Sequence, residues 1–278
     1  MNIIKLPDEL PLESSQSVKV FDYRSSQEIS KQQIVLNQNT FSFLIEGTKE
    51  VVFDNSSLSI NNSKFLIMKS GHCLMTEKLS DIKSYRSVLL FFSNEITLKF
   101  IRKFELNSIG STSHNAVFSF GYDEFIKRFA NSLSDISKLS KNTQKKLLEV
   151  KFEEIMLYLI EIHGTNFLHS LITSSSNVAQ KFTRTVESNQ LNKLTLKELA
   201  FLCDMSVSTF KREFEKQYSE SPMKWFQNKR LEYAYYLLNA AQKSPSEIYF
   251  EVGYENLSSF IQAYKSKYGV TPKLHQKN

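Results

Sequence analysis

The stretch "STFKREFEKQYSESP", residues 208–222, returns with looser lettering as "SSFIQAYKSKYGVTP", residues 258–272. The two copies share bulky aromatic residues and a closing proline at an offset of 50 positions. Within each copy the aromatic residues lie four positions apart, which puts them on one face of a helix. The repeat therefore predicts two equivalent amphipathic helices near the end of the chain. The matched pairs are Phe210 with Phe260, Phe214 with Tyr264, Tyr218 with Tyr268, and Pro222 with Pro272.

The repeat extends upstream into a second, shorter helix in each copy. In the first copy, Thr195 is suited to be an N-cap, and Glu198 stands three residues later at the spacing of a capping box. Leu199 matches Ile248 at an offset of 49, so one residue is inserted in the second turn, near Glu255. A short helix, a tight turn and a longer helix make a helix-turn-helix motif, and the sequence predicts two.

The longer helix of each copy buries its aromatic face and leaves a polar face outside. On that face Arg212 is suited to a bidentate contact with guanine, and Gln262 to one with adenine. A solvated surface helix is the alternative for either copy alone, but the repetition in a basic region favours DNA. The residues that we predict to contact DNA are Ser206, Ser208, Thr209, Lys211, Arg212 and Lys216 in the first copy, and Asn256, Leu257, Ser258, Gln262 and Lys265 in the second.

Between the two copies, "SPMKWFQNKRLEYAYYLLNA", residues 221–240, predicts one long helix. Ser221 is a suitable N-cap, and Pro222 at the first helical position sacrifices no hydrogen bond. A rigid helix would fix the spacing of the two motifs. Two recognition helices about 34 Å apart can enter successive major grooves on one side of a duplex.

Charge is unevenly distributed along the 278 residues, a length that suits two domains. From residue 181 onward there are 15 Lys and Arg against 10 Asp and Glu, whereas the first 180 residues carry 20 against 19. A basic domain beside a neutral one favours a nucleic-acid partner. No membrane span or secretory signal is recognisable, and the two cysteines have no metal-site spacing, so we expect a cytoplasmic protein without a membrane partner or a cofactor.

The first hundred residues are predicted to be mainly strands, as in a small antiparallel barrel or sandwich. "TFSFLIEGTKEVVFD", residues 40–54, predicts a hairpin with its turn at Glu46, Gly47 and Thr48. We expect any ligand pocket of this domain to be mostly apolar, with alternate strand residues facing inward. The residues behind that expectation are Phe41, Phe43, Ile45, Phe65, Ile67 and Met68.

From about Asn94 the apolar spacing becomes helical. One stripe can be either a dimer seam or a face that folds back onto the strands. It consists of Leu148, Phe152, Ile155, Leu159 and Ile162.

Two stretches, residues 196–238 and 246–273, resemble the DNA-binding domain of the AraC/XylS family of bacterial transcription regulators. They are "LKELAFLCDMSVSTFKREFEKQYSESPMKWFQNKRLEYAYYLL" and "SEIYFEVGYENLSSFIQAYKSKYGVTPK". The resemblance implies base contacts from Ser208, Lys211 and Arg212, and from Leu257, Ser258 and Gln262. The sequence departs from the family pattern at Tyr249, usually Ala, and at Ser259, usually Tyr. The N-terminal part resembles, more loosely, the cupin-like regulatory domain of the family's activators of virulence and type III secretion genes.

We therefore expect an α+β chain of two domains: a cupin-like β-barrel or sandwich with flanking helices at 1–172, and an all-α domain with two helix-turn-helix lobes joined by a long helix at 181–278. A Ser-rich linker is expected at 173–180. The expected function is DNA-binding transcription regulation, as an activator, with promoter DNA and RNA polymerase as partners. A small apolar ligand or a regulatory protein would control it, and a homodimer is left open.

Two other classes of function remain as alternatives. One is a metal-free, cupin-like ligand-binding or interaction module whose basic helices bind a protein. The other is a metal-dependent enzyme, which needs about three His and a Glu converging in the barrel. Only His72 lies in the first hundred residues, and the next histidine is His114, so we expect no enzyme.

Overall fold

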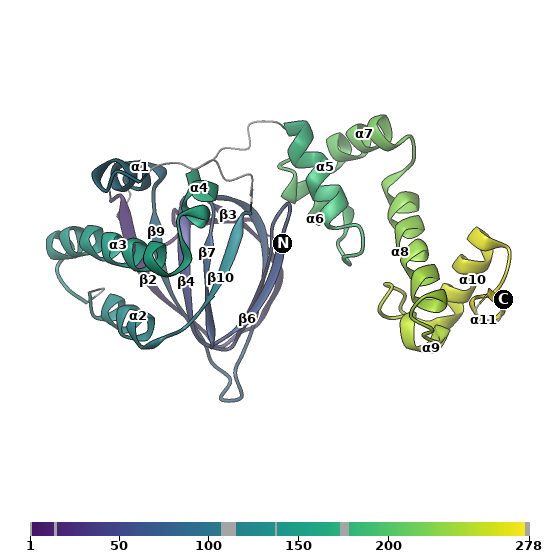
Figure 1. Cartoon of the computed structure of the whole chain (residues 1–278), viewed down its shortest axis with the longest axis horizontal. Helices are drawn as coiled ribbons and strands as arrows, with labels where there is room; N and C mark the ends of the chain where they lie inside the picture. Colours follow the sequence, from purple (N-terminus) through teal and green to yellow (C-terminus); the bar gives the residue numbers. More distant parts are fainter. Residues whose placement is uncertain (1, 14–15, 107–114, 137, 173–177, 276–278) are drawn as a thin grey trace. The chain divides into compact units, whose positions relative to one another are not determined.

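The computed structural model describes residues 2–13, 16–106, 115–136, 138–172 and 178–275. The chain forms two compact units, Met1–Lys181 and Phe182–Asn278, which are described separately (Figure 1). Of the expected linker, residues 173–177 lie outside the described residues, and Val178 already begins helix α5 (Val178–Ser188). Within the described part of the chain, no helix is both long and apolar enough to cross a membrane.

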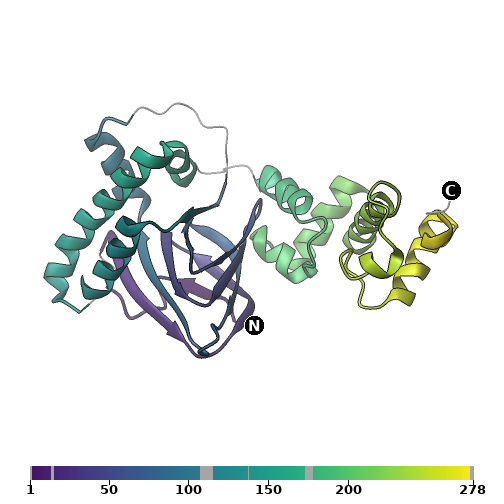
Figure 2. The same ribbon diagram turned by 60° about the horizontal axis from the view of Figure 1, so that its bottom comes forward.

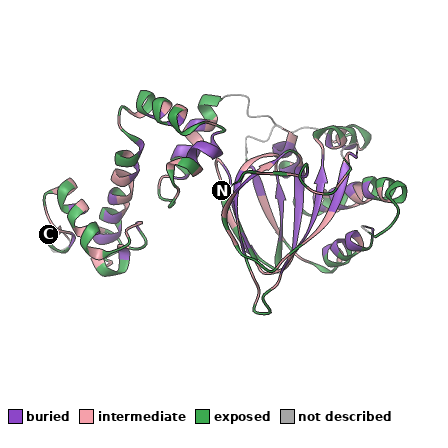
Figure 3. Cartoon of the chain, turned by 180° about the vertical axis from the view of Figure 1, so that it is seen from behind, coloured by how far each residue is buried: buried purple, intermediate pink, exposed green. Residues whose placement is uncertain are grey.

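The N-terminal unit contains two five-stranded sheets, with strand orders β1-β3-β8-β5-β6 and β10-β7-β4-β9-β2. The strand pairs are antiparallel except for β1 with β3. Burial is concentrated in these strands (Figure 3). The strands are β1 (Ile4–Leu6), β2 (Val18–Ser25), β3 (Ile29–Leu36), β4 (Asn39–Glu46), β5 (Thr48–Val52), β6 (Ser57–Asn61), β7 (Lys64–Met68), β8 (Gly71–Lys78), β9 (Tyr85–Phe92) and β10 (Val117–Gly121).

The hairpin predicted around Gly47 is wrong. Strand β4 pairs with β7 and β9, whereas β5 pairs with β6 and β8 in the other sheet. The chain passes from one sheet to the other at Gly47, where φ is 89° and an added Cβ would lie 2.4 Å from the Lys78 carbonyl oxygen. Glycine is needed for this close approach rather than for a hairpin turn.

The helices of this unit gather on one side of the barrel (Figure 2). The apolar stripe of α3 folds back onto the barrel, because Leu148, Phe152, Ile155 and Leu159 join the core shared with β2, β4, β7 and β9. Ile162, the last residue of the predicted stripe, is 51% exposed. The helices are α1 (Asn94–Lys103), α2 (Glu124–Ile136), α3 (Lys141–His163) and α4 (Asn166–Ile172).

The C-terminal unit is helical and contains two separate cores, one for each copy of the repeat. The first core includes Phe210 and Phe214, and the second includes Phe260 and Tyr264. The expected α+β architecture with a strand-rich first domain and two helix-turn-helix lobes is thereby confirmed. The helices, besides α5, are α6 (Leu196–Leu202), α7 (Val207–Tyr218), α8 (Pro222–Asn239), α9 (Pro245–Ile248), α10 (Leu257–Tyr268) and α11 (Pro272–His275).

Candidate nucleic-acid interface

Helix α7 is held by its aromatic face. Phe210 and Phe214 are both 0% exposed, and the Phe182 ring of α5 lies with its centroid 5.2 Å from that of Phe210. Tyr218 continues the same stripe, and burial raises its pKa to about 12, so the phenol stays protonated. The opposite face of α7 is left to solvent, as the sequence predicts.

Helix α10 repeats this arrangement at the same offset of 50 residues. Both helices have 12 residues, and each is followed by a left-handed C-cap, Ser219 with φ 54° or Gly269 with φ 76°. Phe260 and Tyr264 are 0% exposed, like their counterparts in α7. The short helix α6 before α7 has the predicted capping box between Thr195 and Glu198. The local structure thus follows the repeat in helix length, caps and buried face.

Two of the residues predicted to contact DNA have a structural role in addition. The Thr209 backbone N–H donates to Ser206 Oγ at 3.1 Å, so Ser206 is the N-cap of α7. The Ser259 N–H donates to Asn256 Oδ1 at 2.9 Å, so Asn256 is the N-cap of α10. Each cap satisfies one backbone donor at the helix start and fixes where the outward face begins.

The other predicted DNA contacts lie on one face of each helix. Arg212, with 74% of its side chain exposed, has Nε 3.6 Å from Glu213 Oε1, which is a weak surface ion pair. In α7, Ser208, Lys211, Arg212 and Lys216 are exposed and Thr209 is half-buried. In α10, Ser258, Gln262 and Lys265 are exposed and Leu257 is half-buried.

The recognition helix of the second copy, α10, has fewer exposed Lys and Arg side chains than α7 of the first copy. Lys267 of α10 is held by Glu232 Oε1 at 3.1 Å and by the Asn228 carbonyl oxygen at 2.8 Å, both on α8. These contacts tie α10 to the long helix and leave Lys265 as the exposed lysine of α10. The pair with Glu232 therefore serves the fold of the lobe.

A polar groove of about 580 Å³ lies between α8 and α10 and was not predicted from the sequence. Gln262 lines it from the recognition helix, opposite Lys224, Gln227 and Asn228 of α8. The spacing of these α8 residues, at i, i+3 and i+4, is the signal that could have identified them as one face. The groove brings α8 side chains beside a predicted base-reading residue.

No group of three or more His, Cys, Asp and Glu residues that could hold a metal ion occurs within the described ranges. Both cysteines are buried, and burial raises the pKa of the Cys73 thiol to about 12. His114, one of the histidines considered above, lies outside the described residues.

Two protein families match this sequence. Residues 39–171 match the ExsA N-terminal regulatory domain, and residues 199–278 match a helix-turn-helix domain. The virulence regulon transcriptional activator VirF of Yersinia enterocolitica is 32% identical over 127 residues, which are 45% of this chain and 47% of VirF. The HTH-type transcriptional regulator ExsA of Pseudomonas aeruginosa is 30% identical over 124 residues, 44% of this chain and 45% of ExsA.

The chain thus spans about half the length of the curated relatives it matches, and these relatives are transcription regulators rather than enzymes. Among solved structures, ToxT from Vibrio cholerae aligns over 94% of this chain and 98% of its own, at 14% identity and a TM-score of 0.41.

Proposed function

The chain belongs to the AraC/XylS family of bacterial transcription regulators, and we propose that it binds specific DNA sequences and activates transcription. The observation that carries this proposal is the structural repeat itself. Two recognition helices of equal length, each with an N-cap, a left-handed C-cap and a buried aromatic pair, flank one long helix. Such a pair suits a bipartite site with half-sites about one helical turn apart.

The proposal assigns residues 181–278 to DNA binding and residues 1–172 to regulation by a small apolar ligand or a regulatory protein. The match of residues 39–171 to a regulatory domain supports the second assignment. Activation requires contact with RNA polymerase, so we include it among the partners. Because the proposed target is bacterial promoter DNA, we propose that the protein acts in the cytoplasm, at the nucleoid. We leave open whether the protein forms a homodimer, in which two copies of the chain would occupy two DNA sites.

The test is selection of binding sequences from a randomised duplex library by the full chain, followed by titrations at two salt concentrations. We expect a bipartite consensus that is bound roughly 10³-fold or more tightly than random duplex. Affinity should fall steeply with salt, because phosphate contacts release counterions. A chain that selects no consensus, and whose weak binding ignores salt, would instead favour the interaction module whose basic helices bind a protein.

A further inference from the structure

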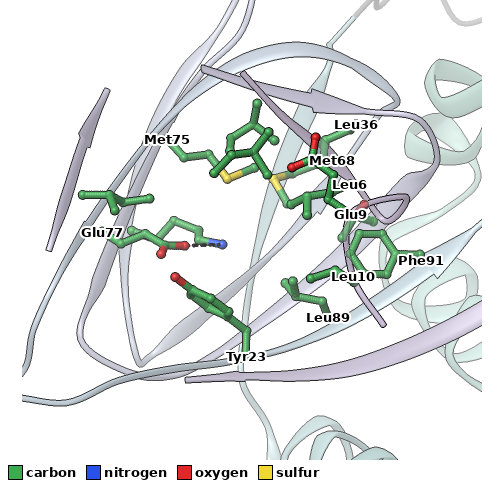
Figure 4. A pocket seen from close by; sticks show the side chains of 15 residues that line it. Leu6, Glu9, Leu10, Tyr23, Leu36, Met68, Met75, Glu77, Leu89 and Phe91 are labelled. Atoms are coloured by element: carbon green, nitrogen blue, oxygen red, sulfur yellow. Dashed lines mark ion pairs between the residues drawn. The ribbon is translucent and has the colours of Figure 1, made fainter. Parts of the chain in front are cut away.

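The two sheets of the barrel line a partly open cavity of about 270 Å³. The labelled side chains of Figure 4 show that its two ends differ in chemistry. Leu6, Leu36 and Phe91 lie at one end, whereas Tyr23 and Glu77 lie at the other, with the Tyr23 hydroxyl pointing toward Glu77 (Figure 4). The volume is close to the lower end of the roughly 300–1,000 Å³ range of small-molecule sites. A mostly apolar chamber with a buried polar end at Tyr23 and Glu77, and with the exposed Glu9 beside the opposite end, fits an amphiphilic molecule.

Of the residues on which an apolar pocket was predicted, Met68 lines the cavity. Phe41, Phe43, Phe65 and Ile67 instead belong to the core that packs against the helices. Apart from Met68, the apolar wall of the cavity is therefore formed by other residues than those predicted, and its polar end was not predicted.

The polar end is built around a buried ion pair. Lys49 Nζ lies 3.2 Å from Glu77 Oε1, and the two side chains are 2% and 6% exposed. Lys49 Nζ also donates to Ser42 Oγ at 3.0 Å. A buried pair of this kind contributes little net stability, because its desolvation offsets its attraction. It does provide fixed hydrogen-bonding groups in the wall of an otherwise apolar cavity.

Tyr23 adds a hydroxyl to this polar end. Burial, and then the negative charge of Glu77, raise the pKa of Tyr23, so its hydroxyl keeps its proton. A protonated phenol can both donate to and accept from a ligand. The hydroxyl and the ion pair together can recognise an uncharged polar group.

The balance of charge decides which head group fits. The positive charge of Lys49 is already matched by Glu77, so a ligand carboxylate would add an uncompensated anion to a buried site. At the other end of the cavity, the exposed Glu9 also lines the wall and repels anions. An anionic head group is therefore disfavoured at both ends, and a cationic one would be uncompensated beside the neutral pair of Lys49 and Glu77.

We propose that this cavity binds a neutral amphiphile, an alkyl chain or compact ring carrying an uncharged hydroxyl or carbonyl group, and discriminates against carboxylates of the same shape. This names the effector class for the regulatory role proposed above and rests on that role for its biological meaning. Binding itself requires only the barrel.

The test uses the full chain with two probes of equal length, 1-octanol and octanoate, at neutral pH. Isothermal titration and the melting temperature should show 1-octanol binding at least tenfold more tightly than octanoate. Glu77→Gln leaves the charge of Lys49 uncompensated, so octanoate should gain at least tenfold over 1-octanol. Glu50→Gln, an exposed position on the same strand as Lys49, is the control and should change neither affinity.

A second variant keeps the test decisive if Glu77→Gln fails to fold. Leu36→Trp fills the apolar end and should abolish 1-octanol binding. The inference is overturned if octanoate binds the unmodified chain as tightly as 1-octanol, if neither probe binds, or if Leu36→Trp leaves 1-octanol binding unchanged. Titration of the same preparations with the selected duplex separates the two proposals: absence of 1-octanol binding in a chain that binds DNA overturns the inference alone.

Discussion

Lys193 Nζ lies 3.7 Å from the centroid of the Phe250 ring. This contact joins the segment before α6 to the segment after α9. The contact links the first copy of the repeat to the second, in addition to the covalent link through α8. Phe250 is 65% exposed, so its ring is not buried in the hydrophobic core of either lobe. An exposed cation–π contact contributes about 0.5–1 kcal/mol. Its position indicates that it helps to fix the relation between the two recognition helices.

We predict that Phe250→Ala weakens binding to the bipartite duplex by about two- to fivefold, the equivalent of that free energy. Binding to a duplex with a single half-site should be unchanged, because each lobe keeps its own core. Fluorescence anisotropy measures the affinity for each of the two duplexes. Phe250→Trp is the control, because it keeps an aromatic ring in contact with Lys193. An equal loss on the single half-site would show local damage instead.

The second motif provides a matched pair of glycines, Gly253 in the turn before α10 and Gly269 at the C-cap of α10. Gly253 has φ 93°, and an added Cβ would lie 3.0 Å from Arg230 Cδ of α8, whereas Gly269 has φ 76° and open space around it. Gly269→Ala should therefore cost only the backbone strain, about 1–2 kcal/mol. Gly253→Ala should cost more, because the Arg230 side chain must also shift. Urea unfolding followed by circular dichroism compares them, and equal losses would rule out a role for the Arg230 contact.

The C-terminal unit could be predicted well because its signals are local. Caps such as Thr195, the paired aromatic residues and the proline at each helix start all act within a few residues of one another. The contact of Lys193 with Phe250 could not be predicted, since it joins residues 57 positions apart in the sequence and follows no periodic pattern.

The barrel was harder to predict because both faces of one sheet are buried. Phe43 packs toward the helices and Met68 toward the cavity, although both are apolar strand residues. Alternation then separates the two faces without showing which one lines a pocket. Lys49 lies only two residues after Gly47, and no local pattern marks it as buried. Its burial depends on β8, which is distant in the sequence and supplies Glu77.

A fragment of residues 178–278 should fold and bind the same consensus as the full chain. Both helix-turn-helix cores are formed by residues from Phe182 onward, so the fragment retains them whole. Trp225 is the only tryptophan of the chain, and its ring packs on Phe214 and Tyr218. Its fluorescence therefore reports whether the first core has formed. An insoluble fragment, or one that binds no duplex at low salt, would contradict the modular assignment.

Acid should weaken the barrel through Asp22. Burial raises the pKa of Asp22, but hydrogen bonds from Arg86 and Arg24 outweigh it and hold the pKa below its ordinary value. Arg86 Nε and Nη2 donate to the two carboxylate oxygens at 2.9 and 3.0 Å. A lowered pKa means that the unfolded chain takes up the proton first. The stabilisation is therefore present above the ordinary pKa of about 3.9 and is lost as pH falls through the folded value.

Asp22→Asn should accordingly lower the free energy of unfolding by about 1–3 kcal/mol at pH 7, since it removes charge-assisted hydrogen bonds. The difference from the unmodified chain should shrink as the pH falls below about 3.9. Denaturant unfolding across this pH range measures the free energy of unfolding of both chains. The control is Asp135→Asn, which removes an exposed ion pair with Lys138 and should have little effect at any pH. A loss that is independent of pH would exclude the carboxylate charge as its cause.

Arg212 and Lys216 are one turn apart on the exposed face of α7, and we predict different roles for them. Arg212 lies nearer the N-terminus of α7, on the same face as Ser208, where a helix inserted in the major groove meets base edges. Lys216 lies in the last turn, where the helix leaves the groove and approaches phosphates. A guanidinium gives bidentate base recognition, whereas an ammonium group acts on phosphate as a point charge.

Arg212→Ala should therefore lose about 1–3 kcal/mol at one base pair of the consensus and relax the preference there. Lys216→Ala should weaken all duplexes alike and reduce the salt slope by about one. Binding to a duplex library at two salt concentrations distinguishes these outcomes, with Lys138→Ala, on the N-terminal unit, as the control cation. If Arg212→Ala keeps every base preference, or Lys216→Ala changes one, the assignment of roles is wrong. If neither variant alters binding, α7 does not read DNA, and the proposed function loses its first recognition helix.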